Sequence, residues 1–134
     1  MICIGIDISK DKHDCLISNS DGDILFDNFT FSNSLEGFEL LFSRIQSCSG
    51  NFSQMKIGLE ATGHYSNNIT EFLVNKNLPI FIINPLHTSL YRKSLSFRKT
   101  KTDKADVHSI VSMLMTQKLT PYVPVSYHRK ELKS

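Results

Sequence analysis

A strict alternation of large and small side chains opens this chain, and it constrains the possible fold more than any other feature. Four large apolar residues alternate with three smaller ones: Ile2, Ile4, Ile6 and Ile8 with Cys3, Gly5 and Asp7. Successive residues of a strand point to opposite faces of a sheet, so this pattern predicts a strand with one large apolar face and one small face. Because Asp7 closes the small face, we expect a buried strand that carries a carboxylate at its end.

The following segments predict a mixed sheet with helices on its faces. Further strands are expected over residues 13–18, 24–31, 56–60 and 80–83, and Ser20-Asp21-Gly22 supplies a turn, so the first three strands should form an antiparallel meander. Helical spacing follows near Asn33, with Gly50 as its stop, and again around residues 69–73. A further helix is expected to start at Asn84-Pro85. The order predicts a mixed five-stranded α/β sheet.

A late helix is predicted to carry two acids toward the core. Thr102 can cap a helix that begins with Asp103, and on that helix Asp103 shares the arc of three apolar residues, with Asp106 beside it: Val107, Ile110 and Leu114. Buried carboxylates must be protonated, paired with cations or bound to metal. The alternative is that both acids merely occupy the first turn, where the helix dipole favours negative charge by roughly 0.3 to 1 kcal/mol.

Four carboxylates are expected to converge at one edge of the sheet. Asp7 and Glu60 close strands, and Asp103 and Asp106 come from the late helix. Open α/β sheets commonly place their sites outside the strand ends. Oxygen ligands suit Mg²⁺ or Mn²⁺, and two such ions about 4 Å apart can stabilise an in-line phosphoryl displacement. These acids are therefore the candidate catalytic and metal-binding residues.

Basic and aromatic residues surround the last two carboxylates. Residues 1–75 hold ten acids and four bases, a net charge of −6, whereas residues 76–134 hold three acids and eleven bases, a net charge of +8. Six of these bases form the candidate nucleic-acid contact, with Tyr91 and Phe97 among them: Arg92, Lys93, Arg98, Lys99, Lys101 and Lys104. Cations bind phosphates and aromatic rings stack on bases. The alternative is a solvated basic face.

Composition points to one domain in a reducing compartment. Cys3, Cys15 and Cys48 have no paired short spacing, so neither a disulfide framework nor a zinc site is predicted, and a cytoplasmic location fits best. No apolar run reaches membrane-spanning length and no basic leader precedes the first strand. We expect a protein that is neither exported nor inserted into a membrane.

Four motifs, in this order, resemble the N-terminal domain of the DEDD transposases of insertion-sequence family 110, relatives of the Piv invertases. They are Gly5-Ile6-Asp7-Ile8-Ser9-Lys10-Asp11, Gly58-Leu59-Glu60-Ala61-Thr62-Gly63-His64-Tyr65, Asn84-Pro85 and Lys101-Thr102-Asp103-Lys104-Ala105-Asp106. The resemblance covers roughly residues 2–125. It implies a ribonuclease H-like fold similar to RuvC-type junction resolvases, with Asp7, Glu60, Asp103 and Asp106 as the metal-binding tetrad.

The resemblance also implies a longer protein. Residues 1–118 would form the RuvC-like catalytic domain, and residues 119–134 would begin a connector to a missing C-terminal domain that carries a serine nucleophile. Relatives are prokaryotic, act on DNA, assemble as homo-oligomers and use a structured guide RNA. If this carries over, the segment from Arg92 to Lys104 is a candidate RNA or DNA contact.

The leading hypothesis is a transposase or site-specific recombinase domain that uses divalent metal ions to cleave and transfer DNA strands, guided by RNA in the full-length protein. The alternative is a non-catalytic module that binds guide RNA and supports assembly when isolated. A third hypothesis, a phosphate loop of the actin-like sugar kinases, is weakened because that loop needs glycine after the aspartate, and residues 8–12 contain none.

Overall fold

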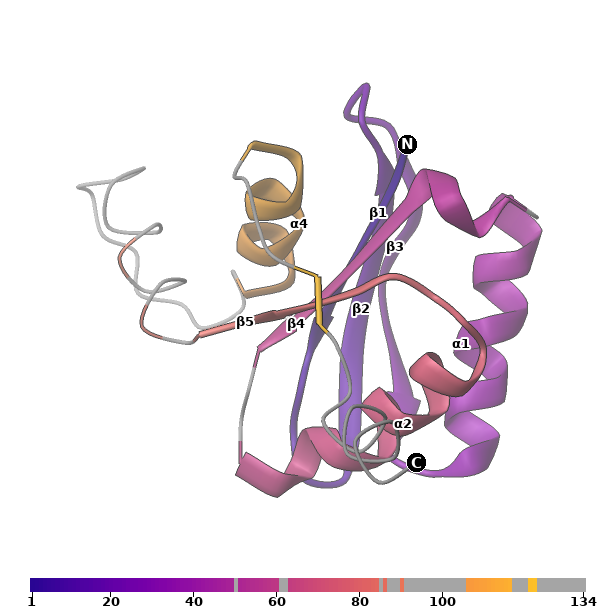
Figure 1. Cartoon of the computed structure of the whole chain (residues 1–134), viewed down its shortest axis with the longest axis vertical. Helices are drawn as coiled ribbons and strands as arrows, with labels where there is room; N and C mark the ends of the chain where they lie inside the picture. Colours follow the sequence, from indigo (N-terminus) through magenta and orange to yellow (C-terminus); the bar gives the residue numbers. More distant parts are fainter. Residues whose placement is uncertain are drawn as a thin grey trace, which may run out of the picture.

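Five strands form one mixed sheet in the computed structural model of the chain (Figure 1). The structure describes residues 1–49, 51–60, 63–84, 86, 90, 106–116 and 121–122. The strands are β1 (Ile2–Asp7), β2 (Lys12–Asn19), β3 (Ile24–Ser32), β4 (Met55–Glu60) and β5 (Ile80–Ile83). Their order across the sheet is β3-β2-β1-β4-β5, with β1, β2 and β3 antiparallel, and with β4 parallel to both β1 and β5. The predicted mixed five-stranded sheet is confirmed.

Helices cover both faces of this sheet. Figure 1 shows α1 (Leu35–Cys48) and α2 (Asn67–Asn75) on one side and α4 (Asp106–Thr116) on the other. Two short 3-10 helices, η1 (Phe52–Gln54) and η2 (Gly63–Ser66), flank β4. None of the helices in the described part of the chain is long and apolar enough to cross a membrane.

The large apolar face of β1 forms the main core with α1 and α2. Ile4 and Ile6 are fully buried there against Leu41 of α1 and Leu73 of α2. The first helix starts one residue later than predicted, because the side chain of Ser34, not that of Asn33, accepts the backbone N–H of Gly37 at 3.4 Å. An N-cap oxygen of this kind satisfies one of the unpaired N–H groups of the first turn.

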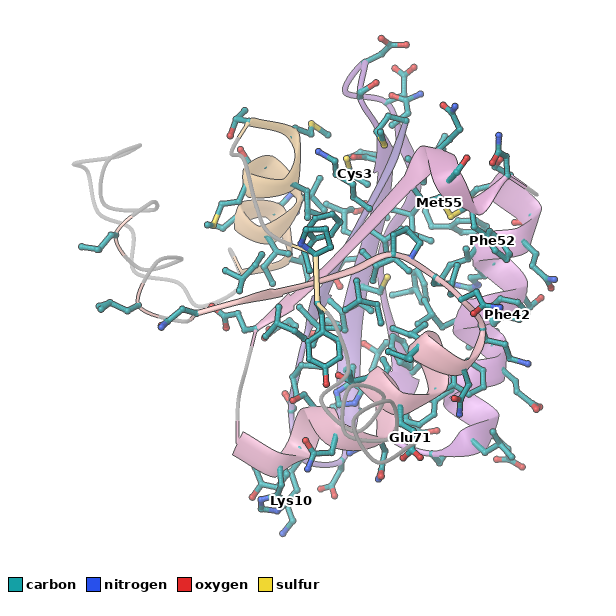
Figure 2. The ribbon with its side chains drawn as sticks, in the orientation of Figure 1. Cys3, Lys10, Phe42, Phe52, Met55 and Glu71 are labelled. Carbon is teal, nitrogen blue, oxygen red and sulfur yellow. The ribbon has the colours of Figure 1, made fainter. Side chains whose placement is uncertain are left out.

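The small face of β1 lies beneath α4. Cys3 and Leu16 form a second apolar cluster with Val107 and Val111 of that helix, and Figure 2 shows the labelled Cys3 beside α4. Of the residues predicted to share the inward arc, Val107, Ile110 and Leu114 are all buried. The predicted helix start at Asp103 lies outside the described residues.

Two glycines let α4 approach the sheet closely. A Cβ atom placed on Gly5 would lie 2.9 Å from the carbonyl oxygen of Val107 and 2.8 Å from a methyl group of Val111. A Cβ atom on Gly58 would lie 3.0 Å from side-chain atoms of Ile110 and Leu114. Since Gly5 and Gly58 are register partners in the parallel pair of β1 and β4, they form one shallow seat for the helix.

Other sequence predictions hold in part. Gly22 takes a positive φ of 95° in the turn between β2 and β3, as the turn sequence predicts. Asn84 accepts the backbone N–H of Leu86 through Oδ1 at 2.8 Å, as a helix cap would. Apart from Leu86 and Leu90, which are helical, the predicted helix lies outside the described residues. The three cysteines, Cys3, Cys15 and Cys48, are free thiols.

The glycine seat predicts unequal effects of two alanine substitutions. Gly5→Ala should destabilise the fold by about 1 to 3 kcal/mol, because its new methyl group meets backbone that only a shift of α4 can move. Gly58→Ala meets the ends of side chains, which can rotate, and should cost under about 1.5 kcal/mol. Urea unfolding followed by circular dichroism measures both. Equal losses, or a larger loss for Gly58→Ala, would contradict the proposed close approach of the helix.

Candidate active site

Asp7 and Glu60 end neighbouring parallel strands. The last register pair of β1 and β4 is Ile6 with Leu59, and each acid is the next residue of its strand. Both acids follow Gly5 and Gly58 by two residues, so they belong to the face that α4 covers. Asp7 is half-buried, and Glu60 is buried, with 9% of its surface exposed. Neighbouring strands lie about 4.8 Å apart, which places two carboxylates close together at one sheet edge.

Helix α4 points its N-terminal end toward this edge. Near its C-terminal end, the carbonyl oxygen of Leu114 accepts a hydrogen bond from Nζ of Lys56 at 3.3 Å. Near its N-terminal end, Val107 lies over Gly5. Lys56 is the register partner of Cys3, so Gly5 lies two residues closer to the carboxyl ends of β1 and β4. The helix therefore runs antiparallel to β1 and β4. Its N-terminus, which is the positive end of the helix dipole, faces the strand ends that carry the two acids.

The structure places the predicted site residues to different extents. Asp7 and Glu60 lie at adjacent strand ends, as predicted. Asp106 is the first residue of α4, and so lies at the helix end that faces the strand ends of Asp7 and Glu60. Its side chain lies outside the described residues. The remaining candidates also lie outside them: Asp103, Arg92, Lys93, Arg98, Lys99, Lys101 and Lys104. Convergence of all four acids stays a prediction.

Asp14 is a further acid on this face that the sequence analysis missed. It is the register partner of Asp7 in β2, and Oγ1 of Thr30 in β3 donates to its Oδ1 at 2.7 Å. A polar row consequently crosses the sheet through Thr30, Asp14, Asp7 and Glu60. Three acids from neighbouring strands therefore lie on the same face of the sheet, at the strand ends.

The chemistry of the donors fits a hard divalent cation. Carboxylate oxygens are the ligands that Mg²⁺ and Mn²⁺ prefer, and the described residues offer Asp7 and Glu60 together. Within the described part of the chain, no group of three or more acids, histidines or cysteines is close enough to hold an ion. The predicted contribution of Asp103 and Asp106 to such a site lies outside the described side chains.

Two polar residues, His13 and Asn33, hydrogen-bond to the backbone of the loop that follows Asp7. Nδ1 of His13 accepts the backbone N–H of Ser9 at 3.1 Å. Asn33 donates twice: its Nδ2 to the carbonyl oxygen of Lys10 and its backbone N–H to that of Asp11, each at 2.9 Å. His13 is buried between aromatic rings, with Phe31 edge-on at 5.5 Å and Phe38 parallel at 6.4 Å. His13 of β2 and Asn33, the residue after β3, thus fix the conformation of residues 9–12.

Comparison with known proteins gives a family and a fold. A family model described as transposase matches residues 4–134. The pilin gene-inverting proteins of Moraxella bovis and Moraxella lacunata are each 38% identical over 104 residues, which are 77% of this chain. This chain spans only 31% of the length of these relatives.

Two solved structures are similar in fold. The Thermus thermophilus RuvC structure has a TM-score of 0.59 at 11% identity and covers 91% of this chain and 100% of that one. RuvC of the same organism in complex with a Holliday junction substrate has a TM-score of 0.55 at 11% identity, over 91% and 99%. The predicted ribonuclease H-like, RuvC-like fold is confirmed.

Burial of His13 predicts a specific pH dependence of stability. Burial lowers the pKa of His13 below its ordinary value of 6.5, against opposing effects of Asn33, the Lys12 backbone and the Asp14 carboxylate. Between the two pKa values the unfolded chain binds a proton that the folded chain does not. The contribution of His13 to stability is therefore fully present above pH 6.5 and is lost as the pH falls below it.

Thermal melts of the parent chain and His13→Asn from pH 7.5 downward, in steps of about half a unit, would isolate this contribution. Asparagine keeps an acceptor for the Ser9 N–H but does not titrate, so the parent should lose stability more steeply on acidification. Parallel curves for the two proteins would contradict a buried neutral imidazole.

Proposed function

Because this chain belongs to the DEDD transposases of insertion-sequence family 110, we propose that it is the catalytic domain of a DNA transposase or site-specific recombinase. The observation that carries the proposal is the position of Asp7 and Glu60, side by side at the ends of parallel strands and on the face that α4 covers. Two carboxylates at adjacent strand ends offer the oxygen ligands that hard divalent cations prefer.

Asp7, Glu60, Asp103 and Asp106 are the proposed ligands of Mg²⁺ or Mn²⁺. When bound, such ions supply Lewis-acid stabilisation to the attacking and leaving oxygens of a phosphoryl transfer. The protein's part is to hold the acids in place before the substrate arrives. Strand register supports this for Asp7 and Glu60, and the close packing of α4 on Gly5 and Gly58 supports it for Asp106, the first residue of that helix.

DNA is the proposed substrate, and the longer protein is the proposed active form. The names of the Moraxella relatives state that they invert a pilin gene, which requires cutting and rejoining DNA, and this chain spans 31% of their length. Strand transfer by this family is proposed to need a C-terminal serine-bearing domain, a homo-oligomer and a structured guide RNA. The basic segment from Arg92 to Lys104 is the proposed contact for RNA or DNA.

Calorimetric titration with Mn²⁺ tests the metal site directly. The parent chain, with a DNA oligonucleotide present, should bind Mn²⁺ saturably. Asp7→Asn and Glu60→Gln should each weaken that binding by at least about tenfold, because each replaces a carboxylate by a neutral amide and removes one negative charge from the site. Glu39→Gln is the matched control, since Glu39 is an exposed acid on α1. This variant should bind Mn²⁺ like the parent.

Equal Mn²⁺ affinity in the parent, Asp7→Asn and Glu60→Gln would rule out the tetrad as the metal site. A parent chain that binds structured RNA but not Mn²⁺ would instead support the alternative function, an RNA-binding and assembly module. Far-ultraviolet circular dichroism of each variant checks that loss of binding is not loss of fold.

A further inference from the structure

The end of the β1–β2 hairpin, residues 9–12, is more rigidly held than its exposure requires. All four residues are exposed, yet His13 and Asn33 make three hydrogen bonds to their backbone, with Ser9, Lys10 and Asp11. An exposed backbone group can hydrogen-bond to water at little cost, so these hydrogen bonds are not needed to satisfy the loop.

The hydrogen bonds that hold residues 9–12 require polar side chains to be buried in the core, which is unfavourable for stability. His13 is 1% exposed, and its imidazole interacts with the side chain of Asn33, whose Oδ1 is also buried, so two polar side chains are buried to hold this loop. An apolar side chain between Phe31 and Phe38 would avoid that cost. A polar arrangement that is unfavourable for stability, next to a functional acid, suggests that the conformation it holds is used.

The hairpin end, residues 9–12, carries two exposed lysines, Lys10 and Lys12. Lys12 lies two residues before Asp14 in β2, so it belongs to the same face of the sheet as Asp14, Asp7 and Glu60. Figure 2 shows Lys10 projecting from the lower end of the molecule, away from α4. With Asp11 between them, the hairpin end has a net charge of +1 beside the acidic row.

In the described part of the chain, no protein group competes for the ammonium groups of Lys10 and Lys12. Across the described residues, neither Lys10 nor Lys12 forms an ion pair or a side-chain hydrogen bond. The backbone of a nucleic acid that reaches Asp7 and Glu60 passes the carboxylate of Asp14 opposite Asp7, and that carboxylate repels phosphates. A cation held immediately outside the acidic row offsets the repulsion on the adjacent phosphates.

We infer that the hairpin end is a second nucleic-acid contact, in which Lys12 and Lys10 bind phosphates of the same DNA strand that enters the acidic site, next to the phosphates that reach Asp7 and Glu60. His13 and Asn33 are positioning residues for this contact. The inference rests on the proposed function and adds to it a binding element separate from the segment Arg92 to Lys104.

Salt-dependent binding of DNA tests this proposal. Fluorescence anisotropy of a labelled oligo-thymidylate would be measured for the 134-residue chain over a NaCl series, with and without Mn²⁺. For single-stranded DNA, each lysine that no longer neutralises a phosphate lowers the slope of log Kd against log salt by about 0.7. Lys12→Gln should therefore reduce the slope by about 0.7, and Lys10→Gln with Lys12→Gln by about 1.4.

Lys76→Gln is the matched control for charge. Lys76 lies over the rings of Phe42 and Phe72, at 5.0 and 5.3 Å, among the residues of the opposite face. Its substitution changes the net charge as Lys12→Gln does and should leave the slope unchanged.

The positioning role has its own readout. His13→Phe removes the acceptor for the Ser9 N–H without changing the lysines and should weaken binding and lower the slope, whereas His13→Asn keeps an acceptor and should restore both. If His13→Phe binds DNA as the parent does, His13 has only a structural role.

Two failures are distinguishable. If the parent binds DNA and Lys12→Gln has an unchanged slope, the hairpin contact is wrong and the proposed function stands. If the parent chain binds no DNA at any salt concentration, DNA recognition by this chain is refuted and the hairpin contact with it.

Discussion

Helix α4 packs on the sheet over Gly5 and Gly58, and the rest of the site depends on how closely it can approach there. A methyl group on Gly5 would meet the helix backbone itself, so the distance between helix and sheet is set by the absence of two side chains. Lys56 binds the far end of the helix through the carbonyl oxygen of Leu114. Together these interactions fix the direction of α4, and the direction brings its first residues toward the edge where Asp7 and Glu60 lie.

The two faces of the sheet have separate roles. One face is apolar from Ile4 and Ile6 of β1 to the helices α1 and α2, and it provides most of the buried surface that stabilises the fold. The other face changes along its length from an apolar cluster beneath α4 to a row of polar groups at the strand ends. Because the first face forms an extensive apolar core, the second face can carry acids side by side at the strand ends.

Much of this arrangement was predictable from residue pattern. The alternation at residues 2–8 predicts β1 and its small face, the acid that ends each strand predicts Asp7 and Glu60, and helical spacing predicts the buried face of α4. Asp14 was not predictable, because its position opposite Asp7 depends on the register of a hairpin whose loop gives no standard turn sequence. The roles of His13 and Asn33 were missed for a similar reason, since both act through hydrogen bonds to a loop that only the folded hairpin brings within reach.

The sequence by itself determined the periodicities, and hence which residues share a face of a strand or a helix, because those follow from local backbone geometry. It also determined the family, because the order and spacing of the motifs can be read from the sequence alone. Only the tertiary structure decided which strand ends are neighbours, which acid stands opposite Asp7 and which way α4 runs across Gly5 and Gly58. These relations join residues far apart in the chain, and they are set by packing between elements, which no local pattern encodes.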